Sequence, residues 1–312
     1  MWIRHHFFRT FVTLSVIVAV GMGLPFLQAE GSYPGLEILY HVRSLSMASV
    51  GTADGSGMDM TVTNPSLLQS AKGGLLLSVM RYPADIQTEM VEWRIPWGRR
   101  TTAVSLRHLG FGTFDERDEE GVKTGQFSAS ETWMSVSFAQ SLFRSLDVGM
   151  TGGLFLSRVQ DVTATLGVLT AGGVVTLNRY DMRVGISVRN LGVTLNSYTE
   201  YGEPVPSSLH VGLTKKLAYL PLELSVDAGW WDKGHRNIVR LGGEFTFPYN
   251  LRLRWGTSSN RFDLESNRLW QDMAAGTSLG VGFLTPNLSV DLGIEYRGVG
   301  GTVLGVGFSS HP

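Results

Sequence analysis

Apolar and polar residues alternate along many segments of the chain after residue 72. From Leu288 to Arg297 every second residue is apolar, and the residues between them are Ser, Asp, Gly, Glu and Arg. The same alternation runs from Met182 to Arg189 and from Leu222 to Trp230. Because successive side chains of a β-strand point to opposite faces, this period of two predicts strands with one apolar and one polar face.

Fourteen segments are predicted to be strands on this basis. They lie near 73–81, 86–96, 99–111, 129–143, 145–158, 163–178, 180–190, 207–217, 221–232, 236–247, 250–258, 271–284, 287–297 and 301–309. An even number of strands brings the chain back to the side on which it started, as bacterial single-chain barrels require. The three long connectors, 112–128, 191–206 and 259–270, fall on one side, and the opposite connectors are short. Such barrels have this distribution of turns and loops.

The chain after residue 30 contains no uninterrupted apolar run of the roughly 18–20 residues that a membrane-spanning helix needs. A closed β-barrel is the other structure that can satisfy its backbone within a bilayer. We therefore expect an all-β fold, a 14-stranded antiparallel transmembrane β-barrel over residues 73–309. A soluble β-sandwich, whose strands also alternate, is the alternative.

The first 72 residues do not alternate. Residues 1–29 have a basic start, an apolar stretch from Phe11 to Phe26 and a small residue, Ala29, at their end, which predicts a secretory signal peptide; an uncleaved anchor is the alternative. Residues 30–72 combine irregular, partly helical apolar spacing with a Gly-rich stretch and the Asn64-Pro65 turn motif. This segment is predicted to be a short, partly helical hatch that plugs the barrel, with a flexible leader or a periplasmic arm as alternatives.

Composition removes several classes of function. The 312 residues include no Cys, so disulfides, thiolate metal sites and cysteine nucleophiles are excluded. The formal net charge of −1 gives no basic field for nucleic acid. A G-x-S-x-G string at Gly276–Gly280 lies inside an alternating strand and not at a strand-to-helix turn, so it predicts no nucleophile. We expect no catalytic residue, no metal site and no cofactor, and hence no enzyme.

Charged residues occupy the polar face of the predicted strands. A charge on the lipid face near the bilayer midplane costs about 2–4 kcal/mol, so these side chains should face the lumen. They are Arg183, Arg189, Asp227, Glu244, Arg252, Arg254, Asp291 and Glu295. Either they line a path for a solute, or they neutralise one another and fill the interior. The acidic run from Asp115 to Glu120 is predicted to lie in the loop 112–128, solvated or collecting divalent cations.

Several stretches resemble one family of outer-membrane barrels. They are Leu36–Ala53 (LEILYHVRSLSMASVGTA), the Asn64-Pro65-Ser66-Leu67-Leu68 motif, residues 188–227 with Arg189-Asn190-Leu191-Gly192, and the ending from Leu251 to Phe308. These resemble the PorV/PorQ family, and 188–227 is most similar to its PorQ branch. The resemblance implies a fourteen-stranded barrel, similar to the long-chain fatty-acid channels, with an N-terminal hatch.

The resemblance also implies a function. It implies a non-enzymatic accessory protein of a type IX secretion system that anchors or scaffolds partner proteins at the outer membrane of a Gram-negative bacterium. The alternative is a FadL-like channel for a hydrophobic small molecule, based on the barrel size and the Asn64-Pro65 hatch. Expected partners are outer-membrane lipid or lipopolysaccharide and secretion-system proteins, with a lipid in the lumen under the alternative.

Overall fold

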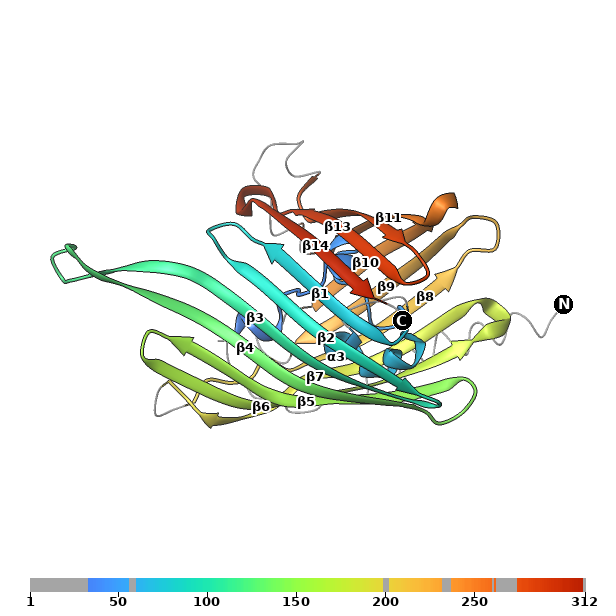
Figure 1. Cartoon of the computed structure of the whole chain (residues 1–312), viewed down its shortest axis with the longest axis horizontal. Helices are drawn as coiled ribbons and strands as arrows, with labels where there is room; N and C mark the ends of the chain where they lie inside the picture. Colours follow the sequence, from blue (N-terminus) through green and yellow to red (C-terminus); the bar gives the residue numbers. More distant parts are fainter. Residues whose placement is uncertain are drawn as a thin grey trace.

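Fourteen antiparallel strands close into a single barrel in the computed structural model of the chain (Figure 1). The structure describes residues 33–55, 60–198, 202–231, 237–259, 261 and 274–310. The predicted signal peptide therefore lies outside the described residues. Each strand pairs with its neighbours in sequence, and β1 pairs with β14 to close the ring, with Leu76 opposite Ser309.

The strands differ in length around the ring. Those from β3 to β7 have 14 to 19 residues, whereas those from β8 to β14 have 8 to 10. Their bounds are β1 Gly74–Arg81, β2 Gln87–Trp97, β3 Arg100–Arg117, β4 Lys123–Ser141, β5 Leu146–Val159, β6 Val162–Leu177, β7 Met182–Asn196, β8 Ser208–Lys216, β9 Leu222–Trp231, β10 Asn237–Thr246, β11 Leu251–Ser258, β12 Thr277–Leu284, β13 Leu288–Tyr296 and β14 Thr302–Ser310.

The outside of the barrel is apolar and its inside is polar. In β1 buried and exposed residues alternate without exception, and the exposed ones include Leu75, Leu77 and Val79. Leu292 in β13 is exposed, while its neighbour Asp291 is buried. An apolar exterior on a closed ring of strands is the arrangement of transmembrane barrels of the outer membrane. The predicted fold class is thus confirmed, the outer-membrane location agrees with it, and the soluble β-sandwich is wrong.

The loop expected over 112–128 is largely strand. β3 continues to Arg117 and β4 begins at Lys123, so the connector is residues 118–122. The two strands form a long arm that extends from the barrel at the left of Figure 1. Phe114 and Phe127 stack across it with their ring centroids 5.4 Å apart. The arm extends beyond the barrel and has no side that must stay apolar, so alternation of apolar residues could not mark it as strand.

The other two long connectors differ from expectation to a smaller degree. In the segment 191–206, residues 191–196 belong to β7, which ends at Asn196. Most of 259–270 lies outside the described residues. β3, β7 and β11 run in the same direction, so the strand ends at which these connectors begin lie on the same side of the barrel as the arm.

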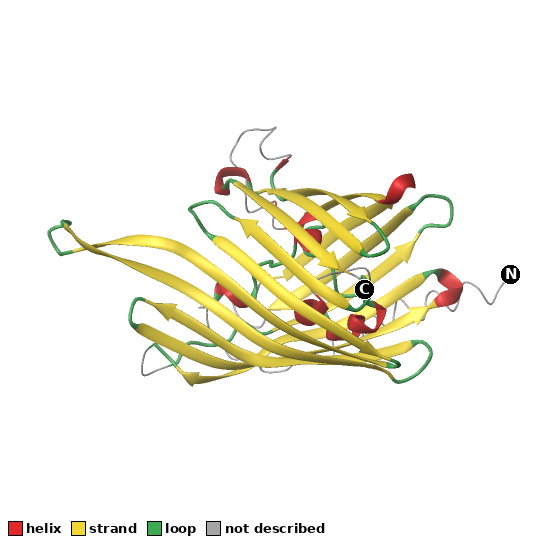
Figure 2. Ribbon diagram, in the orientation of Figure 1, coloured by secondary structure: helices red, strands yellow, loops and turns green. Residues whose placement is uncertain are grey.

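Short helices lie within the ring of strands (Figure 2). The segment before β1 contains η1 Pro34–Leu36, α2 Val42–Ser46, α3 Met60–Thr63 and η2 Pro65–Ser70, and we call residues 33–72 the hatch. Further 3₁₀ turns lie outside the hatch: η3 Asn178–Tyr180, η4 Pro248–Asn250 and η6 Gly298–Gly300. Over the described ranges, no helix has the length and apolarity to cross a membrane.

Apolar hatch residues pack on the inner wall in separate clusters. Tyr33 and Leu36 pack with Trp133, Phe155 and Leu166 of β4 to β6. Val42 and Leu45 pack with Met80, Tyr82 and Val303 on the other side of the ring. Leu67 and Leu68 pack with Ala103, Ala139 and Val174. The hatch therefore crosses the lumen and contacts opposite walls.

Candidate functional site

The Asn64-Pro65 motif joins the hatch to the barrel wall. Asn64 is the N-cap of η2: its Oδ1 accepts from Ser66 N at 3.2 Å, and Pro65 occupies the first turn, where a missing N–H costs nothing. Its Nδ2 donates to Thr52 O in the hatch at 2.7 Å and approaches Gly173 O in β6 and Ile186 O in β7 at 3.3 and 3.4 Å. One side chain thus orders a helix start and fixes it to two strands.

Glycines of the inner wall let the hatch backbone approach closely. A Cβ at Gly149 of β5 would stand 2.5 Å from the carbonyl carbon of Pro65, and one at Gly256 of β11 would stand 2.3 Å from that of Met47. A Cβ at Gly185 of β7 would stand 2.1 Å from Thr52 O. A side chain at any of these positions would push the hatch away from the wall.

Four of the predicted lumen charges meet around one hatch arginine. Glu244 accepts from Arg252 at 2.8 Å, from Arg254 at 2.6 Å and from Arg43 of α2 at 3.0 Å. Arg254 also pairs with Asp291, and Arg43 with Asp54 of the hatch. Three cations and three carboxylates form this group, which we call the latch network (Arg43, Asp54, Glu244, Arg252, Arg254 and Asp291). Its formal charge is zero, so it fits the self-neutralising alternative.

Asp227 holds a different part of the hatch. Its Oδ2 accepts from Gly51 N and Thr52 N, both at 2.9 Å, and from Thr52 Oγ1 at 2.8 Å. Arg189 donates to the same Thr52 Oγ1 at 2.8 Å. These two predicted lumen residues therefore bind one turn of the hatch from neighbouring parts of the wall.

The remaining predicted charges lie apart from both groups. Arg183 pairs with Glu223 at 3.4 Å, with each side chain partly exposed. Glu295 pairs with Arg297 at 2.9 Å, near the end of β13. Both pairs lie on the inward parity of their strands, but neither contacts the latch network through a hydrogen bond between the described residues.

Sequence reasoning missed a second buried ion group in β2 and β3. Glu92 accepts from Arg94 at 2.7 Å and from Arg107 at 3.5 Å, and it also accepts from Thr61 Oγ1 of the hatch at 2.7 Å. Glu92 and Arg94 alternate with the exposed Val91 and Trp93, so the period-two signal was present in the sequence. Arg43 and Asp54 of the latch network had no such signal, because apolar and polar residues do not alternate in the hatch.

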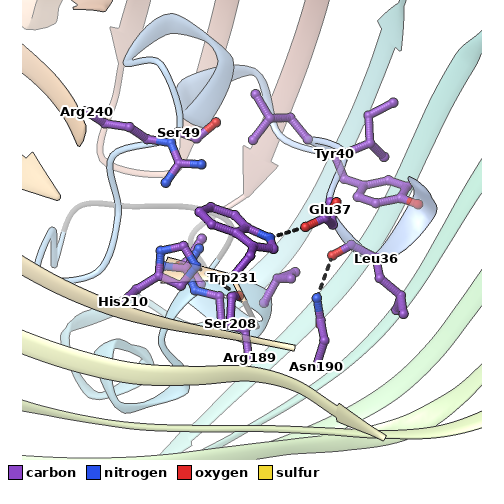
Figure 3. Close-up of a pocket in the computed structure, with 14 residues that line it drawn as sticks. Leu36, Glu37, Tyr40, Ser49, Arg189, Asn190, Ser208, His210, Trp231 and Arg240 are labelled. Carbon is purple, nitrogen blue, oxygen red and sulfur yellow. Dashed lines mark hydrogen bonds between the residues drawn. The ribbon is translucent and has the colours of Figure 1, made fainter. Parts of the chain in front are cut away.

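A pocket lies between the hatch and strands β7 to β10 (Figure 3). Its cavity volume is about 60 Å³, and part of it is open to solvent. The hatch supplies its apolar side, including Leu36, Ile38, Leu39 and Val62, and the wall supplies Arg189, Asn190, Ser208, His210, Trp231 and Arg240. These wall residues lie toward the ends of the strands where the long connectors are, so the pocket is on that side of the hatch.

Trp231 stands at the centre of the labelled side chains in Figure 3. Its Nε1 donates to Glu37 of the hatch. The His210 ring meets it edge-on at 4.9 Å between centroids, and the Arg240 guanidinium lies 5.5 Å from its ring centroid. The indole is therefore held by three partners and offers a fixed apolar surface.

A β-bulge at Asn190 shapes the wall of the pocket. The register between β6 and β7 shifts between Leu169 and Ala171, and Asn190 has a φ of +57°. Its N–H donates to Thr170 Oγ1 at 3.2 Å, and its Nδ2 donates to Leu36 O at 3.1 Å. Pairing of β7 with β8 ends one residue before it, at Arg189 opposite Ser208. The bulge thus re-aims a wall side chain toward the hatch.

Comparison with solved structures places this fold among known channels. The toluene transporter TodX of Pseudomonas putida is 10% identical, with 92% of this chain and 100% of that chain covered and a TM-score of 0.59. The toluene transporter TbuX of Ralstonia pickettii is 13% identical, with coverage of 87% and 97% and a TM-score of 0.57. A Pseudomonas aeruginosa FadL homologue is 11% identical, with coverage of 87% and 98% and a TM-score of 0.56.

At these identities the likeness establishes the fold, which is FadL-like, as the resemblance implied. In sequence, no family model and no curated protein matches the chain. Membership of the PorV/PorQ family therefore stays a prediction.

Proposed function

We propose that this protein is a non-enzymatic outer-membrane channel for a hydrophobic small molecule. The observation that carries the proposal is the pocket between the hatch and β7 to β10, which pairs an apolar hatch surface with a wall of polar residues. The solved structures of the same fold include toluene transporters, which supports the same conclusion.

The hatch makes a wide aqueous pore a poor alternative. It contacts the wall at β5, β7 and β11 through close backbone approaches, and the latch network adds an ion pair between the hatch and β10. A solute must therefore pass through space between hatch and wall. Such a path selects for molecules that bind an apolar surface and have a small free-energy cost of desolvation.

Uptake by whole cells tests the proposal. Cells of a Gram-negative host without such channels, expressing this chain, should accumulate radiolabelled 1,4-dimethylbenzene several-fold faster than cells with an empty vector. Ser208→Trp fills the pocket from the wall and should abolish the gain. Val211→Trp is the matched control, because Val211 lies on the same strand with its side chain exposed on the lipid side. Equal uptake by the parent and by Ser208→Trp would refute the proposal, provided both run as folded barrels on unheated gels.

The accessory role in a type IX secretion system remains a separate proposal. It rests on the sequence resemblance to the PorV/PorQ family and implies partners bound through the connectors on the side of the arm. The solved structures favour the channel instead. Crosslinking in intact cells decides between them: recovery of secretion components with the parent, and their loss when residues 115–126 are replaced by a short turn, would favour the accessory role.

A further inference from the structure

Asn190 Oδ1 and His210 Nδ1 are buried polar atoms of the pocket wall, and neither has a hydrogen-bond partner among the described residues. Both side chains are at most 3% exposed. Of the two, the oxygen can only accept a hydrogen bond. A buried acceptor without a donor costs free energy. A bound molecule that donates a hydrogen bond to Asn190 Oδ1 would remove this cost.

The fold fixes the position of this acceptor. The left-handed backbone of the bulge and the bond from Nδ2 to Leu36 O leave the Asn190 amide no freedom to turn. Glycine would satisfy the backbone at this φ more easily than asparagine. The feature that asparagine adds is its amide, of which one end binds the hatch and the other end is the unpartnered oxygen.

The charges around the pocket balance. Arg189 and Arg240 are offset by Glu37 and by Asp227, the cross-strand neighbour of Arg240. Arg189 already donates to Ser187 Oγ at 3.1 Å and to Thr52 Oγ1 at 2.8 Å, and Arg240 lies over the Trp231 ring. A ligand carboxylate would be desolvated in this pocket without a net positive charge to stabilise it. A neutral hydroxyl has no such need, so the pocket favours the neutral group.

We infer that the pocket selects a neutral, hydroxylated hydrophobic compound, whose hydroxyl donates to Asn190 Oδ1 and whose apolar body rests against the hatch and Trp231. The inference rests on the proposed function, because it names the class of molecule that the channel would take. A site built to bind a hydroxyl discriminates strongly against the analogue that lacks it, since the buried acceptor is then left unsatisfied.

Three matched probes test it: 4-methylphenol, 1,4-dimethylbenzene and 4-methylbenzoate. Binding is measured by equilibrium dialysis to the mature protein in lipid nanodiscs, corrected for empty nanodiscs. We expect 4-methylphenol to bind about tenfold tighter than 1,4-dimethylbenzene, the scale of one buried hydrogen bond. The hydrophobic effect favours the dimethyl compound, so it works against this result. Equal binding, tightest binding of the benzoate, or no binding of any probe would overturn the inference.

Asn190→Gly supplies the matched variant, because it keeps a backbone that tolerates φ of +57° and removes the acceptor. It should reduce 4-methylphenol binding about tenfold more than it reduces 1,4-dimethylbenzene binding, because both probes lose the bond from Nδ2 to Leu36 O that holds the hatch and only the phenol loses its acceptor. Asn250→Gly is the control, as the same exchange at a φ of +63° in the turn between β10 and β11. An equal loss for both probes in Asn190→Gly would show a merely structural role and overturn the inference.

The uptake assay separates the two proposals. Uptake of 1,4-dimethylbenzene that depends on an open pocket, without any preference for the phenol, would leave the channel standing and remove this inference. A preference for the phenol in nanodiscs without uptake by cells would remove the channel alone.

Discussion

Arg43 of the hatch and Glu244 of β10 form an ion pair, with Nε and Oε2 3.0 Å apart, although 201 residues separate them in the chain. Both side chains are almost fully buried. The same arginine pairs with Asp54, so it connects two parts of the hatch to the wall. This one guanidinium therefore binds both the wall and a second segment of the hatch.

Arg43→Met should destabilise the folded barrel by about 3–5 kcal/mol, the scale for breaking a buried pair and leaving its partner charge uncompensated. Urea unfolding in lipid vesicles, followed by tryptophan fluorescence, measures this. Arg117→Met is the control: Arg117 also pairs with an aspartate, but both side chains are exposed on the arm. Its effect should stay within about 1 kcal/mol. Similar losses for the two variants would contradict the role assigned to the latch network.

Gly149→Ala should loosen the hatch without preventing barrel closure. The new Cβ would stand 2.5 Å from the Pro65 carbonyl carbon, so the hatch must move. We expect faster protease cleavage within residues 33–72 and a higher ion conductance in planar bilayers. Gly152→Ala, in the same strand, meets only Leu169 Cδ1 at 3.8 Å and should behave as the parent. The prediction fails if the two variants are cleaved at the same rate.

Acid should weaken the hatch through His41. Burial lowers the pKa of this imidazole well below its usual value, and Arg94, Arg254 and Arg43 lower it further. His41 is therefore neutral in the folded protein, where its Nδ1 accepts from Arg43 N at 3.0 Å. Above about pH 6.5 the unfolded histidine is neutral too, so its contribution to stability is complete there. Below that pH the unfolded state takes up a proton that the folded state does not, and stability falls.

The loss attributable to His41 should grow as the pH falls below 6.5, with an upper limit of about 2 kcal/mol at pH 5. His41→Asn keeps an acceptor at the N-cap of α2 and does not titrate. Urea midpoints at pH 7.5 and pH 5.0 should therefore differ less in the variant than in the parent. An equal difference in both proteins would assign the acid effect to other groups.

The assignment of lipid-facing residues predicts the effect of a charge on the outside of β13. Leu292→Arg places a cation on the exposed apolar face and should cost about 2–4 kcal/mol near the midplane. Phe114→Arg, on the arm beyond the barrel, should cost much less. Folding yields into vesicles at graded urea concentrations compare the two. A tolerated Leu292→Arg would mean that this face does not contact lipid.

The strands were predictable because the bilayer imposes a strict period on them. Leu288 to Arg297 alternates without exception, and β13 forms there. The same reasoning failed for 112–117, because strands that pair beyond the lipid have no face to keep apolar. Sequence alone therefore predicted the membrane part of the wall and missed the arm.

The sites were harder to predict than the wall. The inward parity of Glu244, Arg254 and Asp291 follows from alternation, but their partner Arg43 lies in a segment without a period. The Asn190 bulge could not be predicted from the sequence either. One inserted residue reverses which residues of β7 face outward, so the alternation of apolar residues is interrupted at the bulge. The pocket is lined by residues of four strands and of the hatch. Its position depends on how the hatch packs in the barrel, which no local sequence pattern predicts.

The pairing of β1 with β14 has a consequence for biogenesis. The hatch precedes the first strand, yet Val42, Ser46 and Met47 contact glycines of β11 to β14, the last strands of the wall. These contacts of the hatch therefore cannot form until the last four strands are in place. The hatch is synthesised before β11 to β14 but can dock on them only after they have formed. If the barrel closed before the hatch docked, its lumen would stay open across the membrane.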